Sequence, residues 1–192
     1  MVKTAVIFAN GCEEIEGLSI VDILRRLNIE CDMIGLDSLD ITGGHNIRFK
    51  CDKLISNDLL NYDMVALPGG MGGTQLLASN IDLQNIMKKR FANKKWNAAM
   101  CAAPLAFSKF GLLKQANYTC YPGFEKNISR ENPQATFVDD LTVIDNKNKL
   151  ITSRGPATAM SFAYAIAQTL QCKTAEIESN MLYTYLLKKS RD

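Results

Sequence analysis

The stretch Asn97-Ala-Ala-Met-Cys-Ala-Ala-Pro104 decides how the rest of the chain is interpreted. Its small and apolar residues predict a buried strand, and Pro104 suits the first turn of a helix predicted over 104–110. Cys101 is then expected on the turn from the strand into that helix. Open α/β sheets bind ligands at such turns, and free N–H groups at the helix start favour a thiolate over a thiol. A plain buried cysteine, a common state of this residue type, is the alternative.

Periodic apolar segments surround this stretch. Apolar runs predict strands over 3–8, 29–36 and 64–67, and apolar residues at helical spacing predict helices over 13–27 and 80–92. Strands that alternate with helices indicate a parallel sheet with both faces covered. The expected fold class is therefore α/β, a three-layer sandwich with a mostly parallel sheet.

Two hairpins are expected beside this sheet. Gly43-Gly44 lies between the short extended halves of 41–50, and a second turn separates 135–143 from 149–153. After the second hairpin, Thr158 is expected to cap a helix, since threonine is a preferred residue at that position.

Three strand ends are expected to meet at one edge of the sheet, because parallel strands share one direction. The first strand leads into a helix whose apolar stripe begins at Ile15, with Glu16 beside the stripe. The strand before Pro68 leads into Pro68-Gly-Gly-Met-Gly-Gly73, whose N–H groups can face an anion or oxyanion. Cys101 follows the third strand. Each feature alone has an ordinary explanation, namely a solvated acid, a tight turn and a buried thiol, and their convergence favours a functional site.

Length and charge exclude several classes of protein. The 192 residues suit one domain over 1–192, and the formal net charge of +2 argues against nucleic acid or an anionic membrane as partner. No apolar run approaches the roughly 20 residues of a membrane span. The N-terminus also lacks the pattern of a signal peptide. We therefore expect no nucleic-acid partner and no membrane partner.

The cysteine and histidine content predicts neither disulfides nor metal ligands. The six cysteines are scattered without metal-ligand spacing, which is typical of reduced thiols in a cytoplasmic protein. His45 is the only histidine and lies in the first expected hairpin turn. A lone turn histidine is usually polar surface, and a cluster of histidine ligands is excluded. No metal and no cofactor are therefore expected.

Five short motifs, in this order and spacing, resemble the ThiJ/PfpI family, in particular the branch of the parkinsonism-associated protein deglycase and its small bacterial relatives. The resemblance covers nearly the whole chain. The motifs are Gly11-Cys-Glu-Glu-Ile-Glu16, Val21-Asp-Ile-Leu-Arg-Arg26, Leu67-Pro-Gly-Gly70, Ala99-Met-Cys-Ala-Ala-Pro104 and Thr152-Ser-Arg-Gly-Pro156.

The resemblance implies a flavodoxin-like sandwich that forms a homodimer. It also implies that Cys101 is the reactive cysteine and that the carboxyl group of Glu16 bonds to its sulfur. Gly70 and Ala102 are expected to supply backbone N–H groups as an oxyanion hole, and Arg154 is expected beside the pocket.

One position departs from the family pattern. Where the human-like branch has a histidine before a proline, this chain has Tyr121. A cysteine nucleophile usually needs a base nearby, so proton transfer is expected to fall to Glu16 or water. Cys120 is an accessory thiol or a packed neighbour, and we favour the neighbour.

Two functions follow from the resemblance. The first is a cysteine-dependent enzyme of glyoxalase or protein deglycase type, which acts on small aldehydes such as methylglyoxal and glyoxal or on their adducts. The second is an oxidative-stress sensor with chaperone-like protection, in which Cys101 is oxidised to sulfinic acid without significant turnover.

Overall fold

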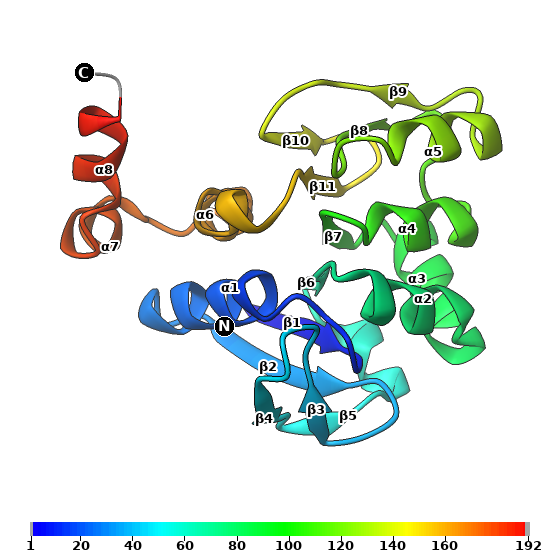
Figure 1. Cartoon of the computed structure of the whole chain (residues 1–192), viewed down its shortest axis with the longest axis horizontal. Coiled ribbons are helices and arrows are strands. Elements are labelled where there is room, and N and C mark those ends of the chain that lie inside the picture. Colours follow the sequence, from blue (N-terminus) through cyan, green and yellow to red (C-terminus); the bar gives the residue numbers. More distant parts are fainter. Residues whose placement is uncertain (1, 191–192) are drawn as a thin grey trace.

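The structure, a computed structural model that describes residues 2–190, is a three-layer α/β sandwich (Figure 1). The strands of its central sheet are β1 (Lys3–Phe8), β2 (Glu30–Gly35), β5 (Lys53–Leu54), β6 (Met64–Leu67), β7 (Trp96–Met100), β10 (Thr142–Asp145) and β11 (Leu150–Ser153). They lie in the order β10-β11-β7-β6-β1-β2-β5. Every neighbouring pair is parallel except β10 and β11. The predicted α/β class with a mostly parallel sheet is confirmed.

Helices cover both faces of this sheet. The first face carries α1 (Glu14–Arg26) and α6 (Ala159–Thr169), which pack against each other. The other face carries α2 (Met71–Ser79), α3 (Ile81–Ala92) and α4 (Pro104–Phe110). The remaining helices are α5 (Glu125–Glu131), α7 (Ala175–Asn180), α8 (Tyr183–Lys189) and the 3-10 turns η1 (Asn57–Asn61) and η2 (Pro156–Thr158). Figure 1 shows α7 and α8 at the end of the molecule beyond α6.

The predicted meeting of three strand ends is confirmed. In the registers of the parallel strands, Val6 of β1 lies opposite Ala66 of β6, which lies opposite Ala98 of β7. The carboxyl ends of these three strands therefore lie side by side at one edge of the sheet. The loops that follow them lead into α1, α2 and α4.

Both predicted hairpins form. In the first, β3 (Asp40–Thr42) pairs antiparallel with β4 (Arg48–Lys50), and in the second β10 pairs with β11. The extended stretch expected over 135–143 is shorter, because only Thr136–Phe137 (β9) and the start of β10 are strands in it. β9 pairs with β8 (Asn117–Tyr118) in a small separate sheet.

The buried face of α1 differs from the predicted stripe. Ile15 is 58% exposed, whereas Glu16 is completely buried. The reason is the close packing of Gly17 on the ring of Phe8, where a Cβ atom on residue 17 would lie 2.2 Å from a ring carbon. This contact turns Glu16 and Gly17 inward. Ile15 is left in solvent.

Two further expectations were wrong in detail. The next helix is predicted to start only at residue 80, but the last residues of the glycine-rich loop already begin α2. Thr158 does occupy the position before α6, yet its hydroxyl group donates to the carbonyl oxygen of Gly155 at 2.8 Å and lies 2.7 Å from the Ser153 hydroxyl. It therefore closes the turn after β11 and does not cap the helix.

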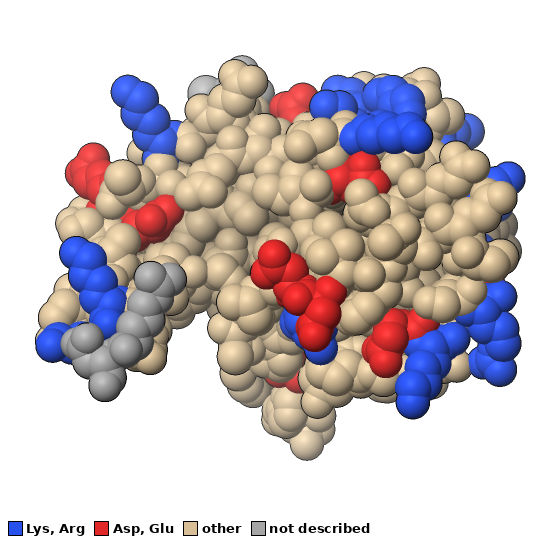
Figure 2. All heavy atoms as spheres, turned by 90° about the horizontal axis from the view of Figure 1, so that it is seen from above, with Lys and Arg blue, Asp and Glu red and all other residues tan. Residues whose placement is uncertain are grey.

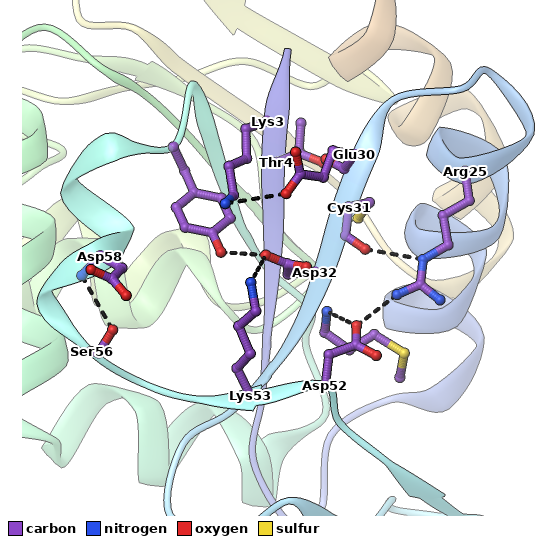
Figure 3. A network of polar contacts seen from close by, with 12 residues as sticks. Lys3, Thr4, Arg25, Glu30, Cys31, Asp32, Asp52, Lys53, Ser56 and Asp58 are labelled. Atoms are coloured by element: carbon purple, nitrogen blue, oxygen red, sulfur yellow. Dashed lines mark hydrogen bonds and ion pairs between the residues drawn. The ribbon is translucent and has the colours of Figure 1, made fainter. Parts of the chain in front are cut away.

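A polar network fixes the far end of α1 to the edge of the sheet (Figure 3). Arg25 donates to the carbonyl oxygen of Cys31 at 3.0 Å and to the carboxylate of Asp52 at 2.7 Å. Lys53 donates to Asp32 on β2 at 2.7 Å. These contacts connect α1 to β2 and to the segment after the first hairpin. They help to set the orientation of the helix that carries Glu16.

The surface shows no single dominant charge. On the face in Figure 2, basic side chains lie mostly around the rim and acidic side chains lie both at the rim and toward the middle, and neither kind covers the face. Within residues 2–190, no helix has the length and apolar content needed to cross a bilayer.

Candidate active site around Cys101

Cys101 lies on the turn between β7 and α4, as predicted. Its backbone adopts the left-handed conformation with φ of 60°, which costs about 1 to 3 kcal/mol for a residue other than glycine. Two hydrogen bonds hold it there. Its N–H donates to the carbonyl oxygen of Ser153 on β11 at 2.9 Å, and its own carbonyl oxygen accepts from the N–H of Tyr121 at 2.9 Å. The residue is 9% exposed, so its side chain sits at the surface edge of the core.

Glu16 reaches the same edge from the first turn of α1 and is completely buried. Its Oε2 atom accepts a hydrogen bond of 2.6 Å from the N–H of Gly69. Among the described residues, its Oε1 atom has no partner with ordinary hydrogen-bond geometry. Burial raises the pKa of this carboxyl group to about 7, while the Gly69 N–H and the Cys101 side chain favour the charged form. Glu16 therefore changes its protonation state near neutral pH.

The glycines after β6 allow the two side chains to meet. A Cβ atom on Gly69 would lie 2.6 Å from the Cβ atom of Cys101 and 2.8 Å from Oε2 of Glu16. Gly70 has φ of 84°, and a Cβ atom there would lie 2.4 Å from the backbone nitrogen of Glu13. Because neither the Cβ atom of Cys101 nor the backbone of Glu13 has room to give way, both positions require glycine.

The electrostatics of the thiol differ from the prediction of a favoured thiolate. Burial raises the pKa of Cys101 to about 12, and the negative charge of Glu16 and its hydrogen bond with the thiol add to this effect. Hydrogen bonds from the N–H groups of Gly70 and Ala102 lower the pKa but only partly offset the other causes. Burial and the neighbouring carboxyl group therefore favour the neutral thiol of Cys101, and burial raises the pKa of Glu16 toward neutral pH.

Two of the predicted site residues lie outside this group. Arg154 forms an ion pair with Asp139, and its guanidinium group lies 5.7 Å from the ring centre of Phe137. None of its described contacts involves the reactive thiol. Cys120 is completely buried, and burial, with a smaller effect of Glu125, raises its pKa to about 12. These properties fit the favoured interpretation of Cys120 as a packed neighbour.

Tyr121 stands at the exposed side of the site. Its backbone contacts Cys101, its ring is near Gly155 and Phe124, and the residue is 46% exposed. It can therefore line the approach to the sulfur. The structure thus brings together Cys101, Glu16, Gly70 and Ala102, with Tyr121 at their border.

Two contacts of this site have no counterpart among the residues predicted from the sequence. Gly69 holds the carboxyl group of Glu16, although only its neighbour Gly70 was singled out. Ser153 supplies the carbonyl oxygen that seats Cys101. The paired glycines after Pro68 were a usable signal for the first contact. The second depends on strand pairing, for which no local signal exists.

Comparison with known proteins finds related chains and structures. The family model described as "DJ-1/PfpI family" matches residues 2–169. The chain is 33% identical to protein dj-1beta of Drosophila melanogaster, over 96% of this chain and 100% of that protein. It is also 33% identical to protein DJ-1 homolog B of Arabidopsis thaliana, over 92% of this chain but only 40% of the larger plant protein.

Two further similarities concern structure and activity. The solved structure of oxidized Toxoplasma gondii DJ-1 superimposes with a TM-score of 0.86 at 32% identity, and the match covers 95% of this chain and 98% of that one. The glutathione-independent glyoxalase DJ-1 of Schizosaccharomyces pombe is 26% identical over 90% of this chain and 93% of its own length. With the family model matched over most of its length, the chain belongs to the DJ-1/PfpI family.

Proposed function

We propose that this protein is a cysteine-dependent enzyme that converts 2-oxoaldehydes, such as methylglyoxal and glyoxal, into 2-hydroxy acids. The observation that carries the proposal is the buried pair of Cys101 and Glu16, with the N–H groups of Gly70 and Ala102 directed at the sulfur. A relative of 26% identity is named a glutathione-independent glyoxalase, which supports the same reaction class.

The first step uses the neutral thiol of Cys101 and the ionised carboxylate of Glu16. The thiol proton passes to Glu16 while the sulfur forms a bond to the aldehyde carbon of methylglyoxal. The aldehyde oxygen then takes this proton from Glu16 and becomes the hydroxyl group of a hemithioacetal, which leaves Glu16 ionised for the next step. The N–H groups of Gly70 and Ala102 stabilise the negative charge that develops on that oxygen. Loss of one such donor lowers the rate about a hundredfold.

The second step moves a proton between the two carbons of the adduct. Glu16 removes the proton from the carbon that bears sulfur and returns it to the neighbouring carbon, while the hydroxyl proton passes to the oxygen of that neighbouring carbon, which gives a thioester of lactate. Water then cleaves the thioester, and lactate and the free thiol are released. A carboxyl group with a pKa of about 7 suits both directions of transfer, because it gains and loses a proton readily at neutral pH.

The test is lactate formation from methylglyoxal by the reduced protein. Cys101→Ser is expected to abolish it, because a hydroxyl group in this position is a far weaker nucleophile. Cys172→Ser is the matched control, since Cys172 is partly exposed and makes no contact with the site, and it should leave the rate unchanged. Full activity in Cys101→Ser would refute the proposed function.

A second function uses the same sulfur as an oxidation sensor. Peroxide would oxidise the Cys101 sulfur to sulfenic and then sulfinic acid, each step adding one oxygen atom and releasing one water. Protonated Glu16, whose Oε1 atom has no ordinary partner, can donate a hydrogen bond to the sulfinate. Mass spectrometry of peroxide-treated protein should show two added oxygen atoms on Cys101 before any other cysteine. Oxidation of Cys101 last would refute this role.

Steady-state turnover at physiological aldehyde concentration distinguishes the two functions. We propose the deglycase reaction, on glyoxal adducts of thiols and amines, as an extension of the first and chaperone-like protection as an extension of the second. We also propose a homodimer, which light scattering after size-exclusion chromatography tests. All six cysteines are unpaired, which supports a reducing compartment, and we propose the cytoplasm.

A further inference from the structure

A second group of chemically competent side chains lies beside the start of α1. It consists of Glu13, Glu14 and His45, whose ligand atoms all lie within 4.8 Å of one another. The Nδ1 atom of His45 lies 2.9 Å from Oε2 of Glu14 and 3.6 Å from Oε1 of Glu13. We propose that these three residues bind a divalent cation of zinc type.

The distances fit such an ion. A tetrahedral zinc ion with bonds of about 2.0 Å separates its ligand atoms by about 3.3 Å. The two distances from His45 lie on either side of this value, and the two carboxylate oxygens lie within 4.8 Å of each other. Imidazole nitrogen with carboxylate oxygen is a usual ligand set for zinc. Three protein ligands leave the fourth position to water, on the side where the His45 side chain is 68% exposed.

The frame around the cluster is preorganised. Oε1 of Glu14 accepts from the N–H groups of His45 at 2.8 Å and Ile47 at 3.4 Å, which fixes the buried carboxylate to the hairpin turn. A Cβ atom on Gly43 would lie 2.1 Å from the same oxygen, so a larger residue would displace the carboxylate. The hairpin is also bound to the loop after β1, because the Gly44 N–H donates to the Cys12 carbonyl oxygen at 2.8 Å.

Charge at this place also favours a cation. Two adjacent glutamates converge on one imidazole, and the side chains of Glu13 and Glu14 are only 14% and 3% exposed. With a neutral imidazole the cluster carries two negative charges that water screens poorly. A bound divalent cation would balance both. The sequence alone predicts that His45 is a polar surface residue. The structure places its ring beside the carboxylates of Glu13 and Glu14.

The cluster is separate from the reactive thiol and close to it. The N–H of Glu13 donates to the carbonyl oxygen of Gly69 at 2.9 Å, and the N–H of Gly69 in turn holds Glu16. The cation is proposed to bind the side chains of residues 13, 14 and 45 only, whether or not the protein has the enzymatic activity proposed above.

The test uses Zn²⁺ and Co²⁺ added to the reduced, chelator-treated full chain. Because His45 is the only histidine, its ring resonances in the nuclear magnetic resonance spectrum report binding without ambiguity. We expect these resonances to shift in a saturable 1:1 titration with Zn²⁺, and Co²⁺ to give absorption bands of nitrogen and oxygen ligation. His45→Ala and Glu13→Gln should each weaken binding at least about tenfold, since even the loss of an outer-shell contact costs that much.

Cys101→Ser is the matched control, because free thiols also bind zinc. Unchanged affinity in this variant supports the proposed site. Thiolate-to-metal absorption with Co²⁺, or affinity that falls in Cys101→Ser but not in His45→Ala, would overturn the proposal. The absence of saturable binding to the wild-type chain would overturn it as well.

Discussion

Replacement of Glu16 by glutamine should stabilise the protein at neutral and alkaline pH. Burial raises the pKa of this carboxyl group from 4.5 to about 7 in the folded protein. Between these two values the folded protein holds a proton that the unfolded chain has lost, so stability falls as the pH rises. A pKa raised from 4.5 to about 7 corresponds to a loss of about 3 kcal/mol in the free energy of unfolding above pH 7. Glutamine keeps the acceptor for the Gly69 N–H but has no such pH dependence.

The measurement is the free energy of unfolding in urea for both proteins, with thiols reduced and a chelator present. Between about pH 5 and about pH 8, the stability of Glu16→Gln relative to wild type should increase by about 2 to 3 kcal/mol, while other groups cancel in the difference. A difference that does not change with pH would refute the assignment of a buried, proton-holding Glu16.

Glu14→Gln is a control for which the stability difference from wild type should depend on pH in the opposite direction. Burial alone would raise the pKa of Glu14, but hydrogen bonds from the side chain and backbone of His45 and from the Ile47 N–H outweigh it and lower the pKa. Because the pKa of Glu14 is lower in the folded protein than in the unfolded chain, its ionised carboxylate adds stability at pH values above the unfolded pKa. This stability is lost as the pH falls through the pKa of the folded protein. The glutamine variant should therefore be less stable than wild type at neutral pH, and the deficit should shrink on acidification.

Three further predictions concern the site itself. Gly69→Ala should lower lactate formation at least about a hundredfold, because its Cβ would displace Cys101 and Glu16, whereas Gly72→Ala, with ordinary contacts only, should stay active. Alkylation of Cys101 by iodoacetamide should be faster in Glu16→Gln, because removal of a neighbouring negative charge lowers the thiol pKa; an unchanged rate would contradict this. Tyr121→His should raise kcat/KM for methylglyoxal about tenfold by supplying a base, and an unchanged value would assign proton transfer to Glu16 alone.

Much of the fold could be predicted because its strands are short apolar runs. Residues 3–8 and 64–67 form strands and 104–110 form a helix with the predicted bounds. Helix α2 was missed because Met71-Gly-Gly has low intrinsic helix propensity, and packing against α4 outweighs that preference. Local pattern predicts an element well when propensity and packing agree, and it fails where they conflict.

The site could be located from the sequence, but its electrostatics could not. Cys101 lies at a predicted strand end and Glu16 follows another, since the parallel direction of the strands follows from the alternation of strands and helices. The complete burial of Glu16 depends on the packing of Gly17 on Phe8, which no local pattern contains. The raised pKa of Cys101 follows from that burial and from the neighbouring charge. The helix dipole and the free N–H groups at the start of α4 predict a lowered pKa for the thiol. In the structure, burial and the charge of Glu16 outweigh them, so this prediction was wrong.

The carbonyl oxygen of Ser153 that seats Cys101 also has a consequence for biosynthesis. A ribosome makes residue 101 well before residue 153, so the emerging chain carries the cysteine before its supporting strand exists. Until β11 joins β7, the left-handed turn lacks one of the two hydrogen bonds that hold it, the one from the N–H of Cys101, and the nascent polypeptide cannot present an assembled reaction centre. Truncated translation products that end before residue 150 should therefore be chemically inert toward aldehydes.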